Sequence, residues 1–183
     1  MRILNLSILF FFLLAGFTAC QDGSSTENAT EVGMDAPAET ESDHDEVARA
    51  DAEFSDPMVD KVFQNYLHLR SALVDSDQAA AAAAAGNMAE SFPTDRAELK
   101  NHAQQIADAG DLDVQREHFS ALTAELGELL EQQLSAGTIY RMHCPMAFDG
   151  AGADWYSEVD QVRNPYYGEK MLTCGKVTET IEM

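Results

Sequence analysis

The stretch DPMVDKVFQNYLHLRSALV, residues 56–74, decides the fold class of this chain. Asp56 suits a helix N-cap, and Pro57 suits the first helical position. Apolar residues then recur at alternating spacings of three and four: Val59, Val62, Tyr66, Leu69 and Leu73, with Phe63 widening the stripe. This period is typical of one face of an amphipathic α-helix. The stretch therefore predicts a helix that buries one face.

A second helix is predicted directly after the first. It begins after Ser76, continues through the alanine run 79–85 and reaches about Ala89. Alanine has the highest helix propensity. Its small side chain also lets a neighbouring helix approach closely.

Two further helices are predicted after the break SFPTD. Thr94 is the expected cap of the third helix, and Asp113 that of the fourth, which ends near Ser135. Their apolar residues again recur at helical spacings: Leu99, Ala103 and Ile106 in the third, and Phe119, Leu122, Leu126 and Leu129 in the fourth. Four helices with short connections predict a mostly α-helical domain over residues 56–183, built as an antiparallel four-helix bundle.

The segment that follows, residues 140–175, has a different composition from the helices. It reads YRMHCPMAFDGAGADWYSEVDQVRNPYYGEKMLTCG and concentrates cysteine, methionine and aromatic residues. Short strand-like runs at 138–142 and 171–173 predict an irregular cap that contains a short two-stranded ribbon and lies across one end of the bundle. Four rings are expected to form its apolar cover: Trp155, Tyr156, Tyr166 and Tyr167.

The N-terminus carries an export signal. Arg2 precedes the apolar run Ile3–Leu14, which is shorter than the roughly 20 residues of a membrane span. The small residues before Cys20 resemble a lipobox, so residues 1–19 are predicted to be a lipoprotein signal peptide and Cys20 the lipidated residue. Plain secretory cleavage near Ala19 is the alternative. Because Gln21, and not aspartate, follows the cysteine, periplasm-facing attachment to the outer membrane is favoured over the inner membrane.

Residues 20–55 are rich in Asp and Glu and poor in large apolar side chains. Such a segment cannot bury enough apolar surface to fold, so it is predicted to be a disordered acidic tether. His44, between two aspartates, is expected to be solvated and not to bind metal. The formal net charge of −21 argues against nucleic-acid binding and against electrostatic docking on anionic lipid.

The motifs YRMHCPMAF, WYS and NPYYGEKMLTCG, with FQNYLHLRSALVDSD and QREHFSALTAEL upstream, resemble the bacterial domain-of-unknown-function family 3347. The resemblance covers about Val59 to Val177. It implies a helical domain found in periplasmic lipoproteins and attached to the membrane-fusion subunits of copper and heavy-metal efflux systems. A metal-efflux component is therefore an expected partner.

The side-chain chemistry of the same segment favours a soft metal ion. Thiolates, thioethers and imidazole suit Cu(I) or a related thiophilic ion. The candidate ligands are Cys144, Cys174, Met146, Met171 and His143, with Met142 as a further neighbour. Zinc ranks lower, because a closed zinc site needs four ligands and the segment offers one histidine and two cysteines.

Two alternatives stay open for Cys144 and Cys174. In an exported protein, two cysteines ordinarily form a disulfide, and closing this loop would contribute about 3–4 kcal/mol on a chain-entropy estimate. The domain would then be an interaction module that binds no metal, with a cap held together by this disulfide. A catalytic or redox-active cysteine is the third possibility. No familiar enzyme motif is present in the sequence, and His68, His102 and His118 are expected to be surface or boundary residues of a protein that is not an enzyme.

Overall fold

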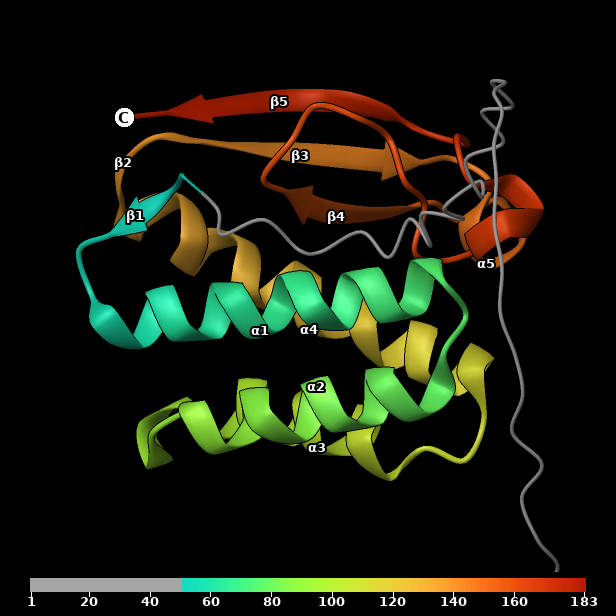
Figure 1. Cartoon of the computed structure of the whole chain (residues 1–183), viewed down its shortest axis with the longest axis horizontal. Helices are drawn as coiled ribbons and strands as arrows, with labels where there is room; N and C mark the ends of the chain where they lie inside the picture. The colour runs from blue at the N-terminus through green and yellow to red at the C-terminus, as the bar shows by residue number, and fades with distance from the viewer. Residues whose placement is uncertain (1–50) are drawn as a thin grey trace, which may run out of the picture. The chain divides into compact units, whose positions relative to one another are not determined.

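Four long helices make up about half of the structure, a computed structural model that describes residues 51–183 (Figure 1). They are α1 (Pro57–Val74), α2 (Gln78–Ser91), α3 (Ala97–Asp108) and α4 (Leu112–Gln133). Each packs against the next, and α4 also packs against α1. The prediction of a mostly helical domain is confirmed. The expected signal peptide, Cys20, His44 and most of the tether lie outside the described residues.

The ends of the helices test the predicted caps. Asp56 caps α1 as expected, since its Oδ1 accepts a hydrogen bond from the backbone N–H of Met58 at 2.8 Å. The predicted caps of the other two helices are wrong. Asp111 caps α4, because it has the extended backbone of a cap residue whereas Asp113 already lies in the first turn. Thr94 begins the short 3-10 helix η1 (Thr94–Arg96) and makes no capping bond to α3.

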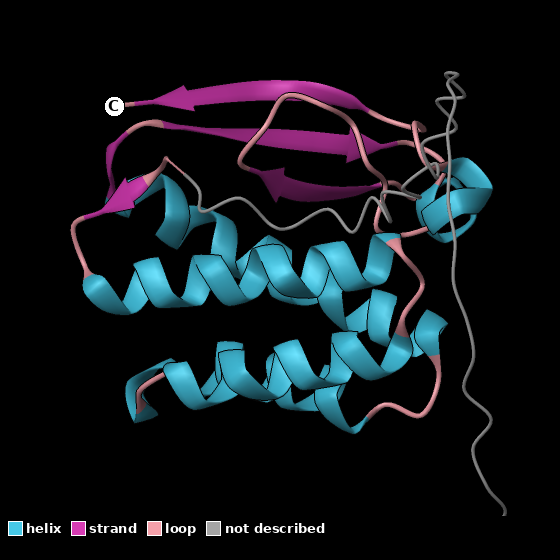
Figure 2. Ribbon diagram, viewed as in Figure 1, coloured by secondary structure: helices cyan, strands magenta, loops and turns pink. Residues whose placement is uncertain are grey.

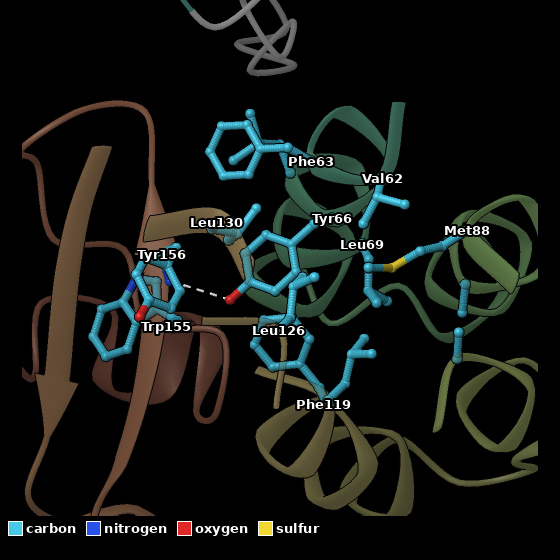
Figure 3. Close-up of a cluster of buried hydrophobic side chains, with 14 of the residues drawn as sticks. Val62, Phe63, Tyr66, Leu69, Met88, Phe119, Leu126, Leu130, Trp155 and Tyr156 are labelled. Atoms are coloured by element: carbon cyan, nitrogen blue, oxygen red, sulfur yellow. Dashed lines mark hydrogen bonds between the residues drawn. The ribbon is translucent and has the colours of Figure 1, made fainter. Parts of the chain in front are cut away.

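The apolar stripes of α1 and α4 meet in the core that Figure 3 shows. Tyr66 is fully buried there, with its ring stacked on that of Phe119 at a centroid distance of 5.1 Å. Its hydroxyl lies 3.0 Å from Oγ1 of Thr123. Burial raises the pKa of Tyr66 to about 12. On the other side of α1, buried alanines of α2 and the side chain of Met88 fill the space between the two layers of helices.

A three-stranded antiparallel sheet lies alongside α1 and α4 (Figures 1 and 2). Its strand order is β4 (Ala153–Ser157), β3 (Thr138–Cys144), β5 (Lys176–Glu182). The first predicted strand is confirmed in β3. The sheet replaces the expected two-stranded ribbon across one end of the helices.

The second predicted strand, at residues 171–173, is wrong. The 3-10 helix η2 (Gly168–Met171) ends there, and β5 starts only at Lys176. The Cys174 N–H donates to the carbonyl of Met171 at 3.0 Å and closes a turn, and the carbonyl of Leu172 accepts from the N–H of Asn164 at 2.8 Å and not from a neighbouring strand. Apolar character alone did not distinguish this turn from a strand.

A small second sheet corrects the boundary of the predicted tether. The strand β1 (Glu53–Phe54) pairs with β2 (Leu134–Ala136), and Ser55 N–H donates to the carbonyl of Gln133 at 2.8 Å. Phe54 is buried, with its ring 5.2 Å from that of Phe63 in an edge-on contact. Residues 51–55 therefore belong to the folded domain. The sequence alone does not predict this, because the segment is acidic on average and its composition does not show that the one ring of Phe54 is buried. Within residues 51–183, no helix combines the length and apolar character needed to cross a membrane.

Candidate metal centre

The fold brings the two predicted cysteine ligands together. Cys144 is the last residue of β3, and Cys174 lies in the turn between η2 and β5. Their Sγ atoms are 3.5 Å apart although the residues are separated by 30 positions, and both are free thiols. Cys144 is 0 % exposed, whereas Cys174 is partly exposed. One sulfur is thus sealed inside the domain and its neighbour is open to solvent.

The sheet positions Cys144, and a buried asparagine positions Cys174. Cys144 lies opposite Ala153, and Met142 lies opposite Trp155, so these four side chains share one face of the sheet. The carbonyl of Cys174 accepts a hydrogen bond from Nδ2 of Asn164 at 2.7 Å. Because the backbone of Cys174 is held in this way, its thiol is directed at Cys144 before any ligand arrives.

A glycine lets the Cys174 turn approach the sheet. Gly175 has a φ of +143°, and a Cβ at this position would lie 2.7 Å from Cη2 of Trp155. Such a contact is too short for any side chain, so only glycine admits this path. Trp155 is fully buried directly beneath the turn.

The sulfur separation of 3.5 Å lies between two chemically defined values. A disulfide bond is about 2.05 Å long. Two sulfurs bound at about 2.3 Å to one metal ion are about 3.8 Å apart at a tetrahedral angle and up to about 4.6 Å apart when the sulfur–metal–sulfur angle is linear. Small rotations of the two side chains reach either state. The pKa of Cys174 is raised, first by its hydrogen bond with Cys144 and further by burial and by the charge of that neighbour.

The structure does not bring His143 to the two thiols. Successive residues of a strand point to opposite faces, so the imidazole of His143 lies on the other side of the sheet from Cys144. There its Nδ1 is 2.6 Å from Oδ1 of Asp154, and Nη2 of Arg141 donates to the other carboxylate oxygen at 2.9 Å. His143 belongs to a separate polar cluster.

The two predicted methionine ligands flank the cysteine pair in the chain and are exposed. Met146 is 52 % exposed two residues beyond Cys144, and Met171 is 37 % exposed one turn before Cys174. The hydroxyl of Tyr167 donates to the carbonyl of Met146 at 2.6 Å and ties the two segments together. Within the described part of the chain, no group of three or more His, Cys, Asp or Glu side chains is arranged to hold a metal ion. The donor set that the structure brings together is therefore the two thiols, and the two thioethers are their neighbours in the sequence.

A groove on the opposite face of the sheet brings His143, a predicted ligand, together with Arg141 and Asp154, which sequence reasoning missed. It has a volume of about 420 Å³ between α4 and the strands β3 and β4, and His143, Arg141 and Asp154 line it. Tyr156 also lines it and donates its hydroxyl hydrogen to Oε1 of Glu131 at 2.6 Å.

Two glycines make room for this groove. A Cβ on Gly127 would lie 2.5 Å from the hydroxyl oxygen of Tyr156, and one on Gly152 would lie 2.7 Å from Cε1 of His143. Gly127 stands in the middle of α4, where glycine lowers helix stability. That placement was the one signal in the sequence that could have pointed to a close contact.

Comparison with known families identifies the helical part of the chain. Residues 62–136 match the family described as "Protein of unknown function (DUF3347)". This part of the chain is similar to the DUF3347 family over less than half of the full sequence. The resemblance stated from the sequence motifs is thereby confirmed for the helices. The comparisons find no matching curated protein and no matching solved structure.

The DUF3347 match extends from α1 to β2 and ends before β3. The cysteine pair lies in the sheet and turns that follow. The family therefore accounts for the helices that support the site, and the chemistry of the site has to be argued from its own side chains.

Proposed function

We propose that this protein is a binding protein for a soft metal ion, Cu(I) in the first place, and not an enzyme. The observation that carries the proposal is the 3.5 Å separation of the Sγ atoms of Cys144 and Cys174, both free thiols. Two thiolates that close to each other can share one thiophilic ion. Met146 and Met171 are the candidates for a third ligand.

The net charge of the chain favours a cation as the ligand. The chain has a formal net charge of −21, which attracts cations and repels nucleic acid. A zinc ion would need two further strong ligands, and His143 is engaged with Asp154 on the opposite face. A low-coordinate thiolate site therefore favours Cu(I) over Zn(II).

The cellular setting forms part of the same proposal. We place the protein in the bacterial envelope, anchored by a lipid on Cys20, facing the periplasm and attached to the outer membrane. We further propose that a metal-efflux component is its partner. We describe the four long helices as an antiparallel bundle that supports the site along one side.

A second function is favoured by the same sulfur separation. A disulfide between Cys144 and Cys174 would tie the turn after η2 to the end of β3 and leave a non-metal interaction domain. The exposed side chains of Met146 and Phe148 would then form part of the contact surface. This alternative requires that the reduced protein has no special affinity for Cu(I).

Anaerobic titration with Cu(I) against a competing chelator separates the two functions. The full chain carrying Cys20→Ser retains only two of its three cysteines, Cys144 and Cys174. Reduced protein should bind one ion per chain, and Cys144→Ser or Cys174→Ser should each weaken binding at least about 100-fold, the range expected when ligation is disturbed. Met146→Leu and Met171→Leu should have smaller effects.

His143→Ala serves as the matched control, because it removes a predicted ligand that faces away from the thiols. Its Cu(I) affinity should equal that of the parent protein. Zn(II) should compete poorly. Equal affinity of the reduced parent and the double cysteine variant would overturn the metal proposal in favour of the non-metal interaction domain.

A further inference from the structure

We propose that Cys174 and Cys144 form a reversible disulfide in a fixed order, in which Cys174 reacts first with an incoming disulfide and Cys144 then displaces the incoming group. While the disulfide is formed, the site has no thiolate with which to bind a metal ion. This inference rests on the proposed metal function only for its consequence, since the order of the two reactions follows from the thiol geometry alone.

The order follows from the difference in exposure between the two sulfurs. A disulfide can be attacked only by a thiolate that can reach it. Cys144 is 0 % exposed at the end of β3, whereas Cys174 is partly exposed in a turn. The incoming disulfide therefore meets Cys174, and Cys144 is shielded from it.

The second step follows from the distance between the sulfurs. Cys144 Sγ is already 3.5 Å from Cys174 Sγ, so it is poised to attack any mixed disulfide that forms there. The hydrogen bond from Asn164 to the Cys174 carbonyl, 2.7 Å long, keeps the backbone in place during the exchange. Side-chain rotation suffices, because the required contraction to a bond of about 2.05 Å is small.

The two steps balance with oxidised glutathione as the reacting disulfide. The Cys174 thiolate attacks one glutathione sulfur, a Cys174–glutathione disulfide forms, and the first glutathione leaves as a thiolate. The Cys144 thiolate then attacks Cys174 Sγ and expels the second glutathione. The protein thiols lose two electrons and two protons, and one glutathione disulfide becomes two glutathione thiols. An excess of a dithiol reduces the protein disulfide again, and the dithiol is itself oxidised to a disulfide.

Closure of the disulfide removes both thiolates that the soft metal ion needs. Disulfide sulfur is neutral and offers no thiolate ligand, and the nearby thioethers are weaker donors. The oxidised protein should therefore lose most of its Cu(I) affinity, and reduction should restore it. The redox state of the compartment would set the fraction of protein able to hold metal.

Intact-mass analysis of the full chain carrying Cys20→Ser tests the order. With oxidised glutathione, the parent protein should lose two hydrogens and keep no adduct. Adding Cys144→Ser should trap one glutathione on Cys174. Adding Cys174→Ser should leave Cys144 unmodified, with adduct formation at least about tenfold slower because access limits exchange. Circular dichroism checks that each variant is folded, and Cys144→Ala replaces Cys144→Ser if the buried hydroxyl unfolds the domain.

Two results would overturn the inference: adduct formation on Cys144 as fast as on Cys174, or a stable glutathione adduct on the parent protein. Cu(I) titration of the reduced and oxidised parent keeps the two proposals separable. Ordered disulfide formation without Cu(I) binding by the reduced form would reject the metal function and keep the exchange order. Tight Cu(I) binding by the reduced form with unordered oxidation would keep the metal function and reject the exchange order.

Discussion

The side-chain hydroxyl of Tyr66 in α1 accepts a hydrogen bond of 3.1 Å from the backbone N–H of Tyr156 in β4, a residue 90 positions away (Figure 3). The same hydroxyl lies 3.0 Å from Oγ1 of Thr123 in α4. One buried oxygen therefore joins two helices to the sheet. The junction holds β4, the strand that pairs with the cysteine strand β3, against both helices.

Tyr66→Phe should destabilise the domain by about 1–3 kcal/mol, because the Tyr156 N–H and the Thr123 hydroxyl both lose a buried partner. Urea unfolding followed by circular dichroism measures the loss. Tyr167→Phe is the matched control, since it removes a hydroxyl whose bond to the Met146 carbonyl lies at the surface. Equal losses of stability in the two variants would show that the buried hydroxyl of Tyr66 stabilises the domain no more than a surface hydroxyl does.

Leu126→Asp should unfold the domain or nearly so. Leu126 is fully buried in α4, and an unpaired carboxylate there costs several kcal/mol, against a typical domain stability of about 5–15 kcal/mol. Val114→Asp provides the comparison in the same helix. Val114 is 40 % exposed in the first turn, where a negative charge is favourable, so this variant should melt at or slightly above the parent temperature.

Gly152→Ala should disturb the groove more than Gly150→Ala does. Both glycines have positive φ, +81° and +89°, so alanine is strained at either position. Only the Gly152 Cβ would also meet the imidazole of His143, whereas nothing lies within 4 Å of the Gly150 position. The difference between the two melting temperatures isolates the imidazole contact. The NMR signals of His143 should shift in Gly152→Ala alone.

Phe54→Ala should cost about 3–5 kcal/mol, the usual loss when a buried phenylalanine ring is removed. Phe54 packs edge-on against Phe63, although it lies in what reads as an acidic linker. Deletion of residues 21–50 is the control and should leave the melting temperature nearly unchanged. A deletion that continues to residue 55 should lower it as Phe54→Ala does. If the shorter deletion also lowers it strongly, the folded domain begins earlier than Asp51.

Glu125→Gln should raise the melting temperature at neutral pH. The pKa of Glu125 is raised above its ordinary value of 4.5, first by burial and then by the charge of Glu98. Because the folded protein holds this proton more tightly than the unfolded chain, ionisation of Glu125 destabilises the fold above its folded-state pKa. The gain should therefore shrink as the pH falls through that pKa and vanish well below 4.5.

The helices were predictable because their signal is local. The three-four spacing from Val59 to Leu73 reports a buried face without knowledge of what covers it. The predicted cap at Asp113 failed because Asp111 and Asp113 are equally good cap residues in the sequence, and only backbone geometry distinguishes them. The predicted cap at Thr94 failed because a 3-10 helix begins there, before α3. Such errors of one or two residues are expected at helix ends.

The candidate site was predictable in its residue types and not in its geometry. The sequence singled out both cysteines, but their 3.5 Å contact depends on the turn built by Asn164 and on the register of β3. Strand alternation could have placed His143 opposite to Cys144 once Thr138–Met142 was extended by two residues. Phe54 and the strand that begins at Lys176 were missed because their partners lie far away in the chain.

The contact between Gly175 and Trp155 provides the protein with an optical probe of its own cysteine pair. Trp155 is the single tryptophan of the chain, and its ring lies directly below the residue that follows Cys174. Indole emission is sensitive to sulfur and to metal ions at short range, so all tryptophan fluorescence of this protein originates beside the site. Its intensity should therefore report reduction, oxidation and Cu(I) loading in unlabelled protein and, by stopped flow, the rate of each step.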